Sequence, residues 1–192
     1  MMRPGMKNGR QIALVQLIPN MLTIAAICAG LTAIRFAVQG GFVQAVLLIM
    51  VACVLDGLDG RIARLLRSDS RMGAELDSLA DFVNFGVAPP LAIYFWTLHD
   101  LRGLGWIAVL VFAICCVVRL ARFNIGAKDD SDCEPATSSQ HFVGVPSPAG
   151  AILAMLPMYV AFAVPQVPPL PDAIICLHLV VVGLAMICTL PT

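Results

Sequence analysis

The chain has 192 residues, of which 59% are hydrophobic and only 12% are charged, and its formal net charge is zero. Soluble domains are about half apolar and about a quarter charged, so this composition excludes an ordinary water-soluble protein. The mean hydropathy of +0.89 agrees with that exclusion. Since there is no excess of basic residues, nothing indicates a nucleic acid as a partner.

Six apolar runs follow one another along the chain. They cover approximately Gln11–Val38, Phe42–Leu66, Leu79–Leu98, Leu104–Ala121, Pro148–Val164 and Asp172–Leu190. Most of these runs approach the roughly 20 residues that a helix needs to cross a membrane. Backbone polar groups cannot stay unpaired in lipid, and the runs lack the two-residue alternation of barrel strands. The sequence therefore predicts an all-α, polytopic membrane protein with about six transmembrane helices in a single domain, residues 1–192.

Basic residues gather at three places along the chain. These are Arg3, Lys7 and Arg10, then Arg61, Arg64, Arg67 and Arg71, then Arg119, Arg122 and Lys128. The positive-inside bias places the N-terminal segment 1–10, the second-to-third connection and a loop at about 126–146 in the cytoplasm. We expect a multi-pass protein of the cell (inner) membrane. Its last apolar run is followed only by Pro191 and Thr192, which is typical of a truncated natural sequence.

Four aspartates are unusual in this apolar chain. Asp56 and Asp59 lie near the end of the second run, and Asp77 and Asp81 lie at the start of the third. Four bare carboxylates in spanning helices would cost on the order of 10 kcal/mol. At 100° per residue each pair shares one helix face, so antiparallel packing lets both pairs face one cavity near the cytoplasmic surface. Carboxylates without histidine or cysteine form a hard oxygen site that suits Mg²⁺, Mn²⁺ or Ca²⁺ rather than zinc.

Small residues accompany the carboxylates. Gly60, Ala63 and Gly73 remove side-chain bulk, so a ligand can approach the backbone closely. Tight helix packing explains such residues when they stand alone, but their alternation with aspartates favours a ligand pocket. A divalent-cation channel or transporter is the alternative from another class, because intramembrane carboxylates also line ion paths. Such a path predicts acidic residues through the full depth of the membrane, whereas here they gather at one end.

The segment from Asp56 to Asp81 resembles a known family. The residues Asp56-Gly57-Leu58-Asp59-Gly60-Arg61-Ile62-Ala63-Arg64, followed after eight positions by Gly73, Asp77 and Asp81, match the signature D-x2-D-G-x2-A-R-x8-G-x3-D-x3-D. This is the signature of the CDP-alcohol phosphotransferases, and every fixed position agrees. The resemblance implies a bundle of transmembrane helices that usually pairs as a homodimer. It also implies an enzyme that joins a CDP-linked donor to an alcohol with release of CMP.

The flanking segments are similar to those of the phosphatidylserine synthase branch of the family. These segments are Pro19–Thr23, Glu75–Gly86, Arg119–Asn124 and Phe142–Ala149. The resemblance implies transfer of a phosphatidyl group from CDP-diacylglycerol to L-serine, giving phosphatidylserine and CMP. A different acceptor, glycerol phosphate or inositol phosphate, is the alternative within the family. Phosphatidylglycerophosphate synthases would be expected to read D-P-L-A-D-K at 77–82.

The same resemblance implies roles for individual residues. The implied ligands of Mg²⁺ or Mn²⁺, with Ca²⁺ able to bind, are Asp56, Asp59, Asp77 and Asp81. Asp81 is also the candidate catalytic base, and the sequence leaves its role as ligand, base or both open. The implied contacts to CDP-diacylglycerol are Asn20, Thr23, Gly60, Ala63, Arg64, Ser70 and Gly73. The candidates for binding serine or a phosphate are Asn84, Arg119, Arg122 and Asn124, and a guanidinium such as that of Arg119 suits bidentate binding of either group.

Overall fold

The computed structural model describes residues 7–66, 71–101, 103–132, 146–164 and 170–188. Every regular element within these ranges is helical, which confirms the predicted all-α class. The elements are α1 (Lys7–Val38), α2 (Phe42–Leu66), α3 (Arg71–Asp81), the π-helical η1 (Phe82–Val87), α4 (Ala88–Trp96), the 3-10 turn η2 (Leu98–Leu101), α5 (Gly103–Asp132), α6 (Ser147–Ala154), α7 (Leu156–Ala163) and α8 (Asp172–Ile187). Ser70, residues 1–6 of the predicted N-terminal segment and residues 133–145 of the predicted loop lie outside the described residues.

Within the described part of the chain, four helical stretches are long and apolar enough to cross a membrane. They are Pro19–Val38, Phe42–Leu66, Met72–Trp96 and Gly103–Ile125. The sixth apolar run forms α8, which has 16 residues, or about 24 Å at 1.5 Å per residue. The fifth run forms two short helices, α6 and α7, which part at Met155. The chain is therefore a helical membrane protein.

Two helical stretches extend beyond their apolar runs, and the predicted start of the cytoplasmic loop is wrong. The third stretch begins at Arg71, before the run that starts at Leu79, and α5 continues to Asp132, past the run that ends at Ala121. Residues 126–132 of the predicted cytoplasmic loop are thus helical. The physical reason is that an apolar run marks the extent of the lipid-facing segment, whereas the backbone hydrogen bonds of a helix continue equally well into water.

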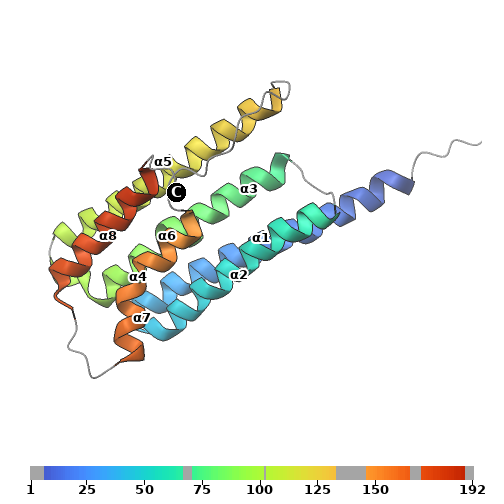
Figure 1. Ribbon diagram of the computed structural model, residues 1–192. Coiled ribbons are helices and arrows are strands. Elements are labelled where there is room, and N and C mark those ends of the chain that lie inside the picture. The colour runs from blue at the N-terminus through green and yellow to red at the C-terminus, as the bar shows by residue number, and fades with distance from the viewer. Residues whose placement is uncertain (1–6, 67–70, 102, 133–145, 165–169, 189–192) are drawn as a thin grey trace, which may run out of the picture.

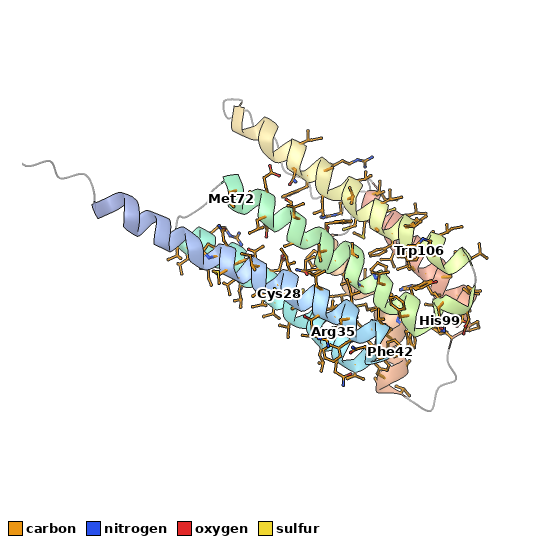
Figure 2. All side chains as sticks on the ribbon, turned by 180° about the vertical axis from the view of Figure 1, so that it is seen from behind. Cys28, Arg35, Phe42, Met72, His99 and Trp106 are labelled. Atoms are coloured by element: carbon orange, nitrogen blue, oxygen red, sulfur yellow. The ribbon has the colours of Figure 1, made fainter. Side chains whose placement is uncertain are left out.

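The helices form a bundle in which α1 packs beside α2 and α5 packs beside α8, with α3, η1 and α4 between the two pairs (Figure 1). Small side chains on α1, such as those of Ala26 and Ala33, are fully buried and allow this close approach. The C-terminal ends of α2 and α5 and the N-terminal end of α3 lie at the same end of the bundle. Met72 marks that end in Figure 2, whereas Phe42 and His99 lie towards the other.

The π-helical segment arises where two prolines interrupt the α-helical hydrogen bonds. Pro89 and Pro90 have no N–H, so the carbonyl of Phe85 has no helical donor at either the fourth or the fifth following position. The N–H of Ala88 bonds to the carbonyl of Val83, the five-residue spacing of a π-helix. Each π turn holds more residues than an α turn, so the segment changes which side chains follow Asp81 on the same face.

One consequence is the position of Asn84, which is completely buried against α1. A Cβ atom on Gly30 would overlap the side-chain amide oxygen of Asn84. Glycine at this position therefore lets η1 pack directly on the backbone of α1, one helical turn deeper in the bundle than Asp81.

Candidate functional site

Three of the predicted carboxylates, two from α2 and one from α3, converge on one point. One side-chain oxygen from each of Asp56, Asp59 and Asp77 lies within 4.8 Å of the other two. The Oδ1 atoms of Asp56 and Asp59 are buried and accept no hydrogen bond from any described residue. Buried carboxylate oxygens without donors are strongly unfavourable unless a cation compensates them. These hard oxygen donors therefore fit a divalent metal ion of the magnesium or calcium kind.

The fourth aspartate, Asp81, is half-buried beside this group. Its carboxyl is close enough to that of Asp56 to share a hydrogen bond, and it interacts electrostatically with Asp77 and with Arg119 of α5. It is not one of the three residues whose oxygens converge. Asp81 thus interacts both with the group of three carboxylates and with the guanidinium of Arg119.

Thr23 holds one of the carboxylates in place. Its buried hydroxyl donates to Oδ2 of Asp59 at 2.6 Å. The carbonyl oxygen of Pro19, a second possible acceptor, lies 3.1 Å from the same hydroxyl oxygen. This residue was predicted as a nucleotide contact, and in the structure its hydroxyl orients a carboxylate. Oδ1 of Asp59 accepts no hydrogen bond from the described residues, so its lone pairs are free for a cation.

Among the remaining predicted nucleotide contacts, those that the structure describes lie on α1, α2 and α3. A Cβ atom on Gly60 would meet nothing within 4 Å, so the space beside this residue is open to a ligand. Arg64 is exposed and donates from Nε to the carbonyl of Gly60 at 3.0 Å. Asn20 on α1 and Gly73 on α3 are half-buried. Ala63 lies on α2, but its side chain, like the whole of Ser70, is outside the described part.

Arg119 is a candidate acceptor-binding residue that interacts electrostatically with Asp81. Its Nη1 donates to Oγ of Ser147 at 2.7 Å, and its buried Nε has no acceptor among the described residues. Ser147 is itself completely buried and is the first residue of α6. The half-buried guanidinium therefore has donor capacity beyond its contact with α6.

Asn84 is completely buried on η1, and neither its amide oxygen nor its amide nitrogen has a partner among the described side chains and backbone groups. The other two candidates are engaged between helices. Arg122 donates from Nη1 to the carbonyl of Ile187 at 3.2 Å, where the last carbonyls of α8 lack helical donors. Asn124 donates from Nδ2 to Oγ of Ser78 at 3.1 Å and so ties α5 to α3.

Residues 16–190 match the CDP-alcohol phosphatidyltransferase family. The chain belongs to this family. It is 50% identical over 148 residues to the CDP-diacylglycerol–serine O-phosphatidyltransferase of Mycobacterium tuberculosis, a match that covers 77% of this chain and 51% of the relative. It is 39% identical over 140 residues to the Bacillus subtilis protein of the same name, covering 72% of this chain and 74% of that protein. The chain thus spans about half the length of the mycobacterial relatives that it matches.

The fold of this family member is similar to that of a solved structure. The crystal structure of Mycobacterium tuberculosis phosphatidylinositol phosphate synthase with CDP-DAG bound matches with a TM-score of 0.63 at 20% identity. The match covers 88% of this chain and 80% of that chain. The predicted family and helical fold are therefore confirmed.

Sequence reasoning missed two serines that contact predicted site residues in this member of the family. Ser147 accepts the hydrogen bond from Arg119, and Ser78 pairs with Asn124. Ser147 had a usable signal, because it lies within the segment Phe142–Ala149 that resembles the family and begins a helix just before a proline. For Ser78 the sequence offered no such signal beyond its position next to Asp77.

Proposed function

We propose that this protein transfers the phosphatidyl group of CDP-diacylglycerol to the hydroxyl of L-serine, giving phosphatidylserine and CMP. In this reaction a bond forms between the serine oxygen and phosphorus, and the diphosphate bond to CMP breaks. The observation that carries the proposal is the convergence of Asp56, Asp59 and Asp77 within 4.8 Å beside Asp81 and Arg119. The names of the Mycobacterium tuberculosis and Bacillus subtilis relatives support serine as the acceptor.

In this proposal Asp56, Asp59 and Asp77 hold a divalent metal ion, Mg²⁺ or Mn²⁺, and Asp81 is available as a further ligand. When bound, such an ion would supply positive charge that stabilises the diphosphate and the leaving CMP. Thr23 orients Asp59 for this task through its hydrogen bond to Oδ2. The open side at Gly60 and the exposed Arg64 are suited to bind the diphosphate.

Asp81 is the residue that we assign as general base. It lies next to the three carboxylates on the side of α5, and Arg119 is its basic neighbour. A serine hydroxyl is a poor nucleophile until its proton is removed, and a carboxylate at this position can accept that proton as the oxygen attacks phosphorus.

We assign Arg119 to the acceptor, whose carboxylate a guanidinium binds in bidentate fashion. The Nε of Arg119 has no acceptor among the described residues, so it is free to donate to that carboxylate while Nη1 donates to Ser147. A glycerol phosphate or inositol phosphate would offer a phosphate to the same group, and this is the second candidate function.

We further propose that the protein acts as a homodimer in the cell (inner) membrane, with the aspartates facing the cytoplasm. The orientation follows from Arg61, Arg64 and Arg122, which are exposed towards the aspartate end of the bundle.

The proposal is tested with purified protein, CDP-diacylglycerol and each acceptor in turn, following CMP release. We expect release with L-serine in the presence of Mn²⁺ or Mg²⁺, no release after treatment with EDTA, and recovery when metal is added back. Release with glycerol phosphate or inositol phosphate but not with serine would select the second candidate. Absence of release with every alcohol, together with divalent-cation flux into proteoliposomes, would reject the transferase in favour of a transporter.

Replacing Arg119 by alanine is expected to raise the KM for serine roughly 10- to 100-fold, the effect of losing a hydrogen bond to a charged group. The KM for CDP-diacylglycerol should change much less. Arg35→Ala is the matched control, because Arg35 is exposed and lies away from the Met72 end of the bundle (Figure 2). An unchanged KM for serine in the Arg119 variant would return this arginine to a purely structural role.

A further inference from the structure

Pro157 leaves one carbonyl of α6 without its helical donor. In an α-helix the carbonyl of Leu153 accepts from the N–H four residues later, and that residue is proline, which has no N–H. The helix accordingly ends at Ala154 and α7 begins at Leu156. The N–H of Met155 is shared between the carbonyls of Ala151 and Leu153, so the Leu153 carbonyl keeps only a local contact in place of its helical one. This break lies inside an apolar run, where a poorly paired carbonyl is unfavourable.

His178 of α8 supplies the missing donor. Its Nε2 lies 2.8 Å from the carbonyl oxygen of Leu153. A carbonyl only accepts hydrogen bonds, so Nε2 must carry the hydrogen in this contact. His178 is the seventh residue of a helix that is otherwise mostly apolar, and a polar side chain in such a helix needs a partner. The carbonyl of Leu153 in α6 and the imidazole N–H of His178 in α8 therefore serve as each other's hydrogen-bond partner.

The contact fixes α6, which begins at the residue that Arg119 binds. Ser147 accepts from Arg119 at one end of α6, and Leu153 accepts from His178 near the other end. Between them α6 lies close on α8, since a Cβ atom on Gly150 would come within 2.6 Å of Sδ of Met186. Figure 1 shows α6 and α8 as neighbours at this side of the bundle.

The same helix α8 also holds α5, the helix that carries Arg119. Arg122 donates to the carbonyl of Ile187 at the end of α8, and Gly183 of α8 lies against Phe112 of α5. Because α8 contacts both α5 and α6, it sets the position of Arg119 relative to Ser147.

We propose that His178 is a positioning residue. Its hydrogen bond replaces the one that Pro157 removes, and so keeps α6 on α8 with Ser147 in reach of Arg119. The effect on acceptor binding rests on the proposed function, whereas the hydrogen bond and the placement of α6 do not.

Thermal unfolding of the full chain in detergent tests the hydrogen bond without reference to activity. His178→Leu should lower Tm by about 2–4 °C, the effect of losing one hydrogen bond between membrane helices in a chain of this size. Pro157→Ala restores an N–H for Leu153, so the same histidine change should cost little in that background. Pro171→Ala, at the start of α8, is the matched proline control and should give no such rescue. An equal loss of Tm in the wild-type and Pro157→Ala backgrounds would overturn the proposal.

Alkylation of Cys116 tests the placement of α6, again without activity. Cys116 is completely buried and its thiol contacts Ser147, whereas Cys188 is exposed and serves as an internal reference. His178→Leu should raise the alkylation rate of Cys116 relative to Cys188 several-fold, and adding Pro157→Ala should reverse that rise. His99→Leu, which alters an exposed histidine at the other end of the bundle, should leave the ratio unchanged. An unchanged ratio in His178→Leu would overturn the positioning role.

Kinetics then test the consequence for the acceptor. We expect His178→Leu to raise the KM for serine roughly 2- to 30-fold, in the range of coupling through packed neighbours, with little change in the KM for CDP-diacylglycerol. His178→Gln keeps a donor and should recover most of the loss. Equal effects on both KM values would contradict action through Ser147 and Arg119. Absence of CMP release from the unaltered protein would instead reject the proposed function, and the unfolding and alkylation results would stand apart from it.

Discussion

Replacing Asp56 by asparagine is expected to lower kcat for CMP release by about 10³-fold or more. The Oδ1 atom of Asp56 is buried and unpaired among the described residues, and it belongs to the group of three converging carboxylates. Asparagine keeps the shape but removes the charge that would hold a cation. A bound metal ion contributes several kcal/mol of transition-state stabilisation, and each 1.36 kcal/mol is a factor of ten in rate. The measurements are CMP release at saturating substrates and Mn²⁺ binding by titration calorimetry.

Asp77→Asn should behave in the same way, because Asp77 supplies the carboxylate of α3 to the same group. Asp100→Asn is the matched control. Asp100 is an exposed aspartate of η2 that pairs with His99 at 3.4 Å, away from the Met72 end (Figure 2). Full activity in Asp56→Asn, or equal loss in Asp100→Asn, would count against the shared metal site.

The convergence of the carboxylates was predictable because it depends on short-range regularities. Asp56 and Asp59 are three residues apart and Asp77 and Asp81 are four apart, so each pair lies on one helix face wherever the helices run. The two pairs come within reach of one cation because α2 and α3 both pack against α1.

The surroundings of Asp81 were not predictable, because they depend on elements that have no local signal at the aspartate. A π turn follows Asp81 directly, and Pro89 and Pro90, which cannot donate helical hydrogen bonds, lie just beyond its far end in α4. The neighbouring charge comes from Arg119, far along the chain. An arrangement that is set by distant neighbours cannot be read from the spacing of the aspartates alone.

The same limit explains why basic residues of one helix have different partners. Arg119 and Arg122 are three residues apart on α5 and were both candidates for the acceptor. The structure gives Arg119 the hydroxyl of α6 and Arg122 the last carbonyls of α8. Hydropathy and charge place both residues at the same membrane face, and only the packing of α6 and α8 on α5 distinguishes them.

Replacing Gly105 by alanine is expected to destabilise the fold. A Cβ atom at this position of α5 would overlap the carbonyl oxygen of Leu98 in η2. A backbone oxygen cannot rotate away as the end of a side chain can, so either the turn or the start of α5 has to move. Overpacking of this kind costs about 1–3 kcal/mol, which corresponds to a fall in Tm of about 2–12 °C for a chain of this size. Thermal unfolding of the purified protein in detergent measures this fall.

Gly103→Ala provides the control two residues earlier in the same helix, because a Cβ atom there would meet nothing within 4 Å. Alanine is a better helix former than glycine, so we expect an unchanged or higher Tm for this variant. Similar losses in both variants would mean that the backbone of η2 does not lie against Gly105. A loss of Tm confined to Gly105→Ala would show that the close contact between η2 and α5 requires a residue without a side chain at position 105. This contact matters for the site, because it sets where α5, the helix that carries Arg119, enters the bundle.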